Sequence, residues 1–447
     1  MPSIAYDSAI FRDLFGTPAM RAVFSDEGLV ARYVEVEVAL ATAQAAVGII
    51  PHAAATAIAT QTQASKIDLA QLKAETDVVG YPIVGIVHQM VKQCGDAGRY
   101  VHWGATTQDI MDTATVLQLR AALALVGADL AAIEAALAGL AAKHRDTVMA
   151  GRTHLQHALP ITFGYKAAVW LSMIRRHRER LAQLEPRVLV AQFSGAAGTL
   201  ASLGDKGLDV QAAFAAELGL EQPDITWHSA RDGVAEAVSF LGLVTGSLSK
   251  IAVDVMLMMQ TEIGEVFEPF APGRGSSSTM PQKRNPISCE MIVALAKIVR
   301  AQVGLMLDGM AADHERATGP WHIEWIALPQ AFVAASGALY QARFMLEGLI
   351  VEPAAMRRNL DATGGLIVAE AVMMALAPHM GRGAAHDVVY ACCRDALEHG
   401  TPLLDQLRQR SDITRHFDAA ALEGLVEPGN YLGVAQAMVD RMVRSTS

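Results

Sequence analysis

Long segments with the composition of α-helices dominate this sequence. One long helix is expected from about residue 111 to 144, where alanine, the residue with the highest helix propensity, is abundant. Further helices are expected at about 25–47, 162–188, 229–267, 287–310 and 328–350. No run of strands with alternating apolar and polar residues is present, and no Gly-x-Gly-x-x-Gly motif follows a strand, so a nucleotide-binding α/β fold is excluded. The sequence therefore predicts an all-α fold with a central bundle of long helices flanked by two smaller helical parts.

The apolar character of these helices has two interpretations. The segment from Ala121 to Ala142 is long enough to span a lipid bilayer. It contains Asp129 and Glu134 and is mostly alanine rather than leucine, so a buried helix is the preferred interpretation and no membrane partner is expected. The long helices are apolar around much of their circumference, which predicts burial against partner subunits of an oligomer.

Composition limits the kinds of partner that this chain can have. Of its 447 residues 52% are hydrophobic, which argues against disorder, and its net charge of −10 without a basic block argues against a nucleic-acid partner. The four cysteines lack zinc-ligand spacing, and two of them are adjacent, which suits no ordinary disulfide framework. The pairs His314–Glu315 and His322–Glu324 lack His-Glu-x-x-His spacing, so no metal is expected. With no signal peptide visible, these features predict a reduced, cytoplasmic protein.

Three polar loops interrupt the helices, at residues 102–109, 151–160 and 273–286. The third loop holds three consecutive serines together with Lys283 and Asn285, which can donate hydrogen bonds to an anion. A polar linker between helices is the alternative interpretation. The pattern Ser-Ser-x-Met-Pro-x-Lys-x-Asn-Pro is, however, far more specific than loop composition, and loops on rigid scaffolds often hold the chemistry. The sequence therefore predicts a site for an anionic substrate.

The pattern in residues 273–286 closely resembles the signature of the fumarase/aspartase superfamily, and residues 151–156 resemble the corresponding segment of fumarase. The resemblance implies a three-domain, all-α fold, with domains at 1–110, 111–355 and 356–447. It also implies a homotetramer, in which the three polar loops come from three different subunits and meet in shared active sites. The implied partner is a small anionic polycarboxylate, and no cofactor is implied.

The resemblance also assigns catalytic roles by position. Ser277 is the implied base, which removes a proton from the carbon next to a carboxylate, and Lys283 holds the negative charge that develops. His154 is the implied acid/base group, and Glu290 is the carboxylate that pairs with it in the family. Serine can act as a base only where an electropositive, water-excluded loop stabilises its alkoxide. A lone histidine in a helical protein is usually structural, which is the alternative for His154.

Substrate-binding roles are implied on all three loops and at one arginine. The residues are His102, Thr106, Thr107, Gln108, Thr153, Ser278, Asn285 and Arg316. Hydroxyl and amide groups suit a carboxylate, which needs several donors once it is removed from water. The alternative for the first loop is a helix N-terminus capped by Thr106 or Asp109. Both interpretations can hold, because helix N-termini bind anions.

Stretches such as residues 17–21, 267–269 and 356–360 resemble the bacterial 3-carboxy-cis,cis-muconate cycloisomerases, and this resemblance covers almost the whole chain. Those enzymes add a carboxylate across a double bond to form a lactone. Two positions depart from them: His154 stands where those enzymes have tryptophan, and Gln282 replaces a histidine. Because the histidine at 154 resembles the lyases, the alternatives are a C–N lyase that releases fumarate and an epimerase of an aminopolycarboxylate such as iminodisuccinate. A non-catalytic structural homologue is a further alternative, against which the presence of Ser277 and Lys283 argues.

Overall fold

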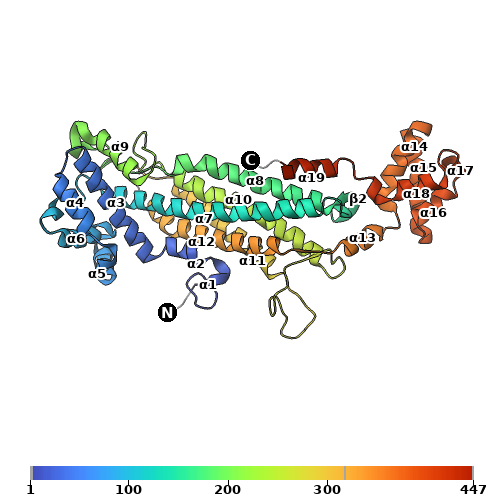
Figure 1. Cartoon of the computed structure of the whole chain (residues 1–447), viewed down its shortest axis with the longest axis horizontal. Helices are drawn as coiled ribbons and strands as arrows, with labels where there is room; N and C mark the ends of the chain where they lie inside the picture. Colours follow the sequence, from blue (N-terminus) through green and yellow to red (C-terminus); the bar gives the residue numbers. More distant parts are fainter. Residues whose placement is uncertain (1–3, 317–318, 445–447) are drawn as a thin grey trace. The chain divides into compact units, whose positions relative to one another are not determined.

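Two compact units make up the chain in the computed structural model, which describes residues 4–316 and 319–444 (Figure 1). The first unit contains the described parts of Met1–Leu130, Arg176–Ser249 and Met291–Gln341. The second contains those of Ala131–Arg175, Lys250–Glu290 and Ala342–Ser447. Each unit therefore combines segments that lie far apart in the sequence. The three-domain division at residues 110 and 355 remains a prediction.

Helices predominate, as predicted. The long ones are α3 (Asp26–Ala46), α7 (Thr107–Lys143), α8 (Phe163–Val188), α10 (Asp232–Met259), α11 (Ile287–Gly309) and α12 (Pro320–Glu347). The two largest differences from the predicted bounds are eight positions each. Helix α10 ends at Met259 rather than near residue 267, because the chain enters the short strand β3 (Val266–Phe267). Helix α12 begins at Pro320, eight positions before the predicted start at 328, since proline is well tolerated in the first turn of a helix.

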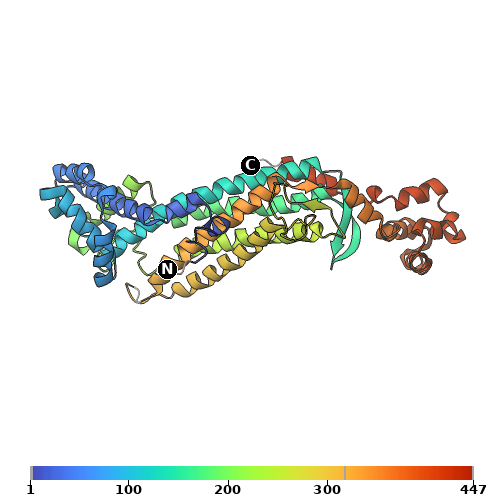
Figure 2. The ribbon, with the colours of Figure 1, turned by 90° about the horizontal axis from the view of Figure 1, so that it is seen from below.

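Polar contacts join the long helices within each unit. In the first unit, His177 of α8 lies 2.8 Å from the Ser247 hydroxyl of α10, and α11 and α12 are joined by a hydrogen bond between two glutamines. In the second unit, Trp170 Nε1 of α8 donates to Asp254 of α10 at 2.9 Å. Figures 1 and 2 show the long helices of the first unit side by side from two directions. On α7, fully buried apolar residues recur every three or four positions, at Leu119, Leu123, Val126 and Leu130.

Shorter helices form the remainder of the first unit. They are α1 (Arg12–Phe15), α2 (Pro18–Val23), α4 (His52–Gln61), α5 (Leu69–Val79), α6 (Ile83–Cys94), α9 (Gly207–Leu218) and the 3₁₀ helices η1 (Ala64–Lys66), η2 (Gly95–Tyr100) and η3 (Ala201–Lys206). Helix α3 begins as predicted, because the Ser25 hydroxyl accepts from Gly28 N at 3.1 Å. Its apolar residues share a core with α4, α6 and α9. This core supports the loop 102–109.

The second unit carries the hairpin of β1 (Val148–Thr153) and β2 (Gln156–Thr162), and a pairing of β3 with β4 (Ile350–Val351). Its other elements are α13 (Pro353–Asp361), η4 (Leu366–Val368), α14 (Ala369–Met380), α15 (Arg382–His399), α16 (Leu403–Arg408), α17 (Ser411–Thr414), α18 (Ala419–Val426), η5 (Pro428–Asn430) and α19 (Ala435–Arg444). Ala150 of β1 packs with Leu360 and Val368, so a small apolar cluster joins the hairpin to α13 and η4.

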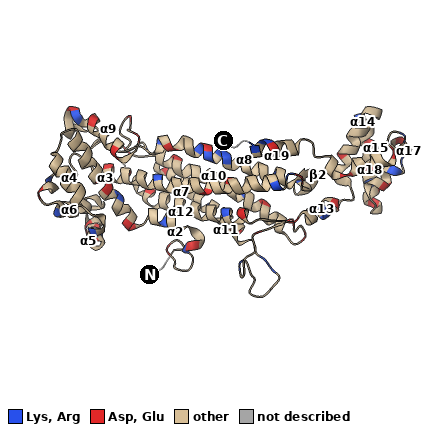
Figure 3. Cartoon of the chain, in the orientation of Figure 1, with Lys and Arg blue, Asp and Glu red and all other residues tan. Residues whose placement is uncertain are grey.

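By length and composition alone, α7 and α10 could each cross a membrane. The long helices also expose apolar side chains in the single chain, among them Val169, Leu243 and Val253. Figure 3 shows acidic and basic residues interspersed along the helices, in line with the absence of a basic block from the sequence.

Candidate active site

Backbone pairing closes the serine-rich loop 273–286. Ser276 and Arg284 form an isolated antiparallel bridge, and Asn285 N donates to Gly275 O at 2.9 Å. Gly275 has a φ of +67°, and a Cβ there would lie 2.6 Å from Asn285 O, so this close approach of two backbone segments requires glycine. Figure 1 shows the loop extending away from the helices. The loop therefore has a defined base and a solvent-exposed tip.

Charged side chains anchor the base of this loop. The Glu268 carboxylate accepts hydrogen bonds from Ser288 N at 3.2 Å and from Cys289 N at 2.8 Å, which caps the N-terminus of α11. Arg274 donates to the Ser288 hydroxyl at 2.5 Å, and its guanidinium lies 4.2 Å from the centre of the Phe344 ring. These contacts hold the start of the loop against the N-terminus of α11, the helix that follows the end of the loop.

The hydroxyl of Ser277 faces two backbone donors. Its Oγ accepts from Met280 N at 3.1 Å and from Thr279 N at 3.3 Å. Hydrogen bonds to the charged form of a group favour that form, so this geometry favours an alkoxide. Ser277 and Lys283 are the next residues inside the bridge that closes the loop, and Lys283 is exposed. The loop can therefore present a serine oxygen and a lysine ammonium on neighbouring segments.

The predicted polar loop 151–160 is a β-hairpin, which is a correction to the expectation of a loop. Thr153 pairs with Gln156, so the turn consists of His154 and Leu155 alone. Their φ values are +52° and +63°, as a two-residue turn of the mirror-image type I requires. Residues other than Gly, Asn and Asp rarely adopt this backbone conformation. The sequence prediction missed the hairpin because its turn lacks the usual Asn-Gly or Asp-Gly signature.

A buried ion pair holds the hairpin. Arg152 donates two parallel hydrogen bonds to Glu265, at 2.7 and 2.9 Å, and Glu265 is completely buried. Asn359 donates to the same carboxylate at 2.9 Å. Arg152 is thus a positioning residue for the turn that carries His154.

The other predicted residues of these two loops, and Glu290 in the first turn of α11, lie wholly or partly at the surface of the single chain. Thr153, His154, Ser278 and Glu290 are exposed, and Asn285 is half-buried. No hydrogen bond or ion pair within the described chain joins His154 to Glu290. The pairing that the family resemblance implies is therefore not made inside one chain, and its test requires a second copy.

The first loop belongs to the first unit and is organised by Asp109. Its carboxylate accepts from the backbone N–H groups of Thr106, Ser194 and Gly195, each at 3.0 Å, and lies 2.8 Å from His228 Nε2. Asp109 and His228 are both buried. The predicted capping role of Asp109 is correct, because it satisfies the N–H of Thr106 at the start of α7.

The predicted ligands of this loop differ in their accessibility. Arg316 donates to the Thr106 hydroxyl at 2.8 Å and to Ala196 O at 2.6 Å, so it orders the loop, and Thr106 and Thr107 are partly exposed. Gln108 is completely buried and donates to His228 O at 2.9 Å. Its Oε1 has no hydrogen-bond partner among the described residues.

His102 faces a buried carboxylate. Its Nδ1 lies 2.6 Å from Oε1 of Glu37, which is 1% exposed. Burial disfavours the imidazolium, but the Glu37 carboxylate outweighs burial and raises the pKa of His102. The contact with Glu37 therefore favours the protonated form of His102.

Sequence reasoning missed a buried ion cluster behind this loop. Arg231 donates to Asp112 at 2.8 and 3.0 Å and to Glu324 at 2.6 and 2.8 Å, and all three residues are at most 4% exposed. In the sequence, Glu324 is considered with His322 as a possible pair of metal ligands and is rejected because of its spacing. In the structure its partner is Arg231. No local motif marks this cluster, because Glu324 and Asp112 lie 93 and 119 positions from Arg231.

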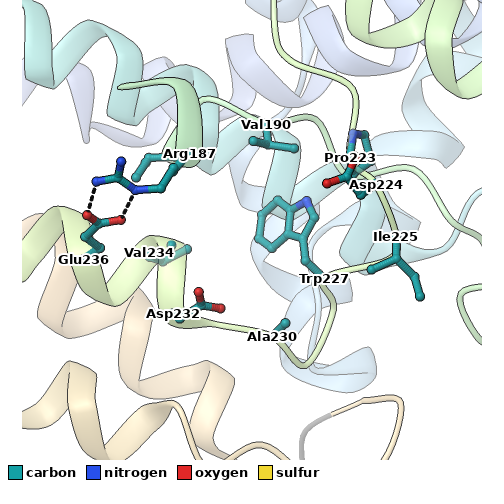
Figure 4. Close-up of a pocket in the computed structure, with 12 residues that line it drawn as sticks. Arg187, Val190, Pro223, Asp224, Ile225, Trp227, Ala230, Asp232, Val234 and Glu236 are labelled. Atoms are coloured by element: carbon teal, nitrogen blue, oxygen red, sulfur yellow. Dashed lines mark hydrogen bonds and ion pairs between the residues drawn. The ribbon is translucent and has the colours of Figure 1, made fainter. Parts of the chain in front are cut away.

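A separate cavity of about 220 Å³ in the first unit is lined by none of the predicted site residues (Figure 4). Trp227 and Ile225 form its apolar wall, and the ion pair of Arg187 with Glu236 lies at its rim. Within the described ranges, no group of three or more His, Cys, Asp or Glu side chains is placed to hold a metal ion.

Fold and loops together define a class of protein with long helices joined by polar segments, which here carry Ser277, Lys283 and His154. A family model described as Lyase matches residues 15–301, and one described as Adenylosuccinate lyase C-terminus matches residues 365–442. The chain belongs to the fumarase/aspartase superfamily of lyases and related isomerases.

Similar proteins span the chain from end to end. A crystal structure of a fumarate lyase from Mesorhizobium sp. BNC1 is 56% identical, with a TM-score of 0.91 over 96% of this chain and 98% of that one. Trans-aconitate decarboxylase 1 of Mycosarcoma maydis is 50% identical, over 100% of this chain and 91% of its own. A 3-carboxy-cis,cis-muconate cycloisomerase of Acinetobacter baylyi is 46% identical over 98% of both chains.

Proposed function

We propose that this enzyme transfers a proton at the carbon next to a carboxylate of a small polycarboxylate, with lactonisation of 3-carboxy-cis,cis-muconate as the reaction. The observation that carries the proposal is the pair of backbone N–H groups on Ser277 Oγ. Relatives named as cycloisomerases, of which the chain covers nearly the full length, support the choice of substrate.

The chemistry follows from these groups. A substrate carboxylate oxygen adds to one carbon of the double bond, and the π electrons move to the neighbouring carbon, where the attached carboxylate delocalises them. Lys283 and Asn285 bind this doubly charged group. The Ser277 hydroxyl then protonates the carbon, and its alkoxide, held by the N–H groups of Thr279 and Met280, recovers a proton from solvent. In the reverse direction the same alkoxide removes the proton.

We further propose a soluble, cytoplasmic homotetramer with shared sites. In the single chain Ser278, His154 and Glu290 are exposed and have no catalytic partner among the described residues. Apolar side chains on α8 and α10, such as Val169 and Leu243, are also exposed and suit burial in a subunit interface. Domains at 1–110, 111–355 and 356–447 belong to the same proposal.

A second candidate function rests on His154. The His154 imidazole is exposed on a two-residue turn, so it is accessible to act as an acid/base group. A cycloisomerase that tolerates tryptophan at this position has no need of it. A C–N lyase or an epimerase of an aminopolycarboxylate such as iminodisuccinate would use it to protonate a leaving group or the opposite face of the carbanion.

The deciding experiment follows the ultraviolet absorbance of 3-carboxy-cis,cis-muconate mixed with the purified enzyme. We expect rapid loss of the diene absorbance and none with Ser277→Ala. The matched control is Ser276→Ala, whose hydroxyl donates to Gly273 O at 2.9 Å rather than lying at the base position.

The same assay decides between the two candidates. Wild-type rates with His154→Trp support the cycloisomerase. An enzyme that is inactive on the diene, but converts iminodisuccinate or trans-aconitate in a manner dependent on Ser277 and His154, favours the second candidate. A Ser277→Ala variant as active as the wild type on any of these substrates would contradict the role of Ser277.

A further inference from the structure

A cavity of about 410 Å³ in the second unit adjoins the turn of the hairpin. Arg152 and His154 line it from the hairpin, Lys166 from α8, and Asp254 and Gln260 from the end of α10 and the residue that follows. The rest of its wall is apolar. Charged groups over an apolar wall are typical of a ligand site rather than of core packing.

The charges around this cavity do not balance. Arg152 is paired with Glu265, and Asp254 is paired with Lys250 and accepts a hydrogen bond from Trp170. Lys166 Nζ makes no hydrogen bond or ion pair with any described residue. The cavity therefore carries an excess of one positive charge, and that charge belongs to Lys166.

The surroundings of Lys166 make this charge unfavourable without a ligand. Burial lowers the pKa of Lys166, and Lys250 and Arg152 lower it further. The carboxylates of Asp254 and Glu265 oppose this effect only in part. A desolvated ammonium is stabilised when an anion approaches it, because the anion supplies the hydrogen bonds and opposite charge that water no longer provides.

We propose that this cavity binds a carboxylate anion, with the Lys166 ammonium as the principal cation and His154 at the rim. Two sources share this chemistry: a carboxylate of the substrate itself, and a separate small polycarboxylate that binds beside the active site. The proposal does not depend on which reaction the enzyme catalyses.

The test uses the full-length enzyme and tricarballylate, a saturated tricarboxylate, as the probe in isothermal titration calorimetry. We expect Lys166→Met to weaken binding by roughly tenfold or more, because one desolvated charge pair is lost. Lys166→Arg should keep most of the affinity. Asp254→Asn should tighten binding, because it removes the carboxylate that competes with the ligand.

The control is Lys66→Met, which removes the same charge from an exposed position on η1. Thermal melting separates loss of the site from misfolding: tricarballylate should raise the melting temperature of the wild type and of Lys66→Met, but not of Lys166→Met. Equal affinity of Lys166→Met and the wild type would overturn the proposal, as would equal weakening by both lysine substitutions.

Inhibition kinetics identify the source of the carboxylate. Competitive inhibition by tricarballylate, with a raised KM in Lys166→Met, assigns the site to the substrate. Binding that persists at saturating substrate assigns it to a separate polycarboxylate. Because the primary readout is binding, an enzyme inactive on every substrate tested leaves this test intact and bears only on the proposed reaction.

Discussion

At the scale of single residues, the environment of a side chain decides what its sequence motif can do. Among the described serines 276–278, only Ser277 has a side-chain oxygen that accepts hydrogen bonds from two backbone N–H groups. Gln108, predicted as a ligand on the same grounds as Thr106, is completely buried and already donates to a backbone carbonyl. Composition could not separate these cases, because accessibility is a property of the packed chain.

His102 provides a pH-dependent prediction. Its folded pKa is raised, so the stability contributed by its contact with Glu37 is fully present below the ordinary histidine pKa of about 6.5 and is lost as pH rises through the folded pKa. We expect His102→Gln to lower the free energy of unfolding by about 1.5–3 kcal/mol near pH 6 and by less near pH 9. Urea denaturation at both pH values measures this, and a pH-independent difference would contradict it.

For His177 we predict that stability depends on pH in the opposite direction. Burial and then the neighbouring Arg180 and Arg176 lower its pKa to about 4. The unfolded chain therefore binds the proton first, and stability falls as pH decreases from about 6.5 towards about 4. In His177→Gln this acid sensitivity should be weaker, whereas His52→Gln, at an exposed position, should leave it unchanged. Denaturation midpoints between pH 7 and pH 4.5 provide the comparison.

At the scale of elements, helices were predictable and the hairpin was not. Alanine-rich composition and apolar periodicity are local signals, and they placed α3, α8 and α11 within one or two residues of their bounds. The hairpin depends on pairing between β1 and β2 and on the contact of Arg152 with Glu265, which lies 113 positions away. Long-range contacts of this kind leave no periodic trace in the sequence.

The two-residue turn allows a direct test. Leu155 has a positive φ and is 76% exposed, so Leu155→Gly relieves backbone strain without loss of packing in the single chain. We expect stability to stay unchanged or to rise by up to about 1 kcal/mol. Leu159→Gly, within strand β2, should lower stability instead. Thermal melting compares the two, and a clear loss with Leu155→Gly would indicate that a partner chain covers this side chain.

At the scale of the whole molecule, the fold supplies a scaffold, and the proposed homotetramer would complete the site. The predicted residues lie in two units of the chain, with 102–109 in the first and 151–160 and 273–286 in the second. Among the described residues of one chain, no hydrogen bond or ion pair joins His154 to Glu290. Shared sites between subunits would supply such contacts.

Subunit mixing tests the shared site. Ser277→Ala and His154→Ala should each be inactive in a reaction that needs both residues. If the two residues reach one site from different subunits, refolding the two variants together should restore partial activity, because some sites then receive both intact side chains. Refolding each variant alone is the control. An inactive mixture that contains verified mixed tetramers would show that one chain supplies both residues.

The sequence by itself determined the helical class of this protein, the approximate extent of its long helices and the motifs of its superfamily, since each is encoded by residues close together in the chain. Only the tertiary structure decided which serine oxygen receives backbone donors, where His154 is presented, and that Arg231, Asp112 and Glu324 form one buried cluster. It also placed Lys166 beside the hairpin turn, with no hydrogen bond or ion pair to any described residue. The physical reason is that burial, hydrogen bonding and charge balance depend on segments that meet only when the chain is folded.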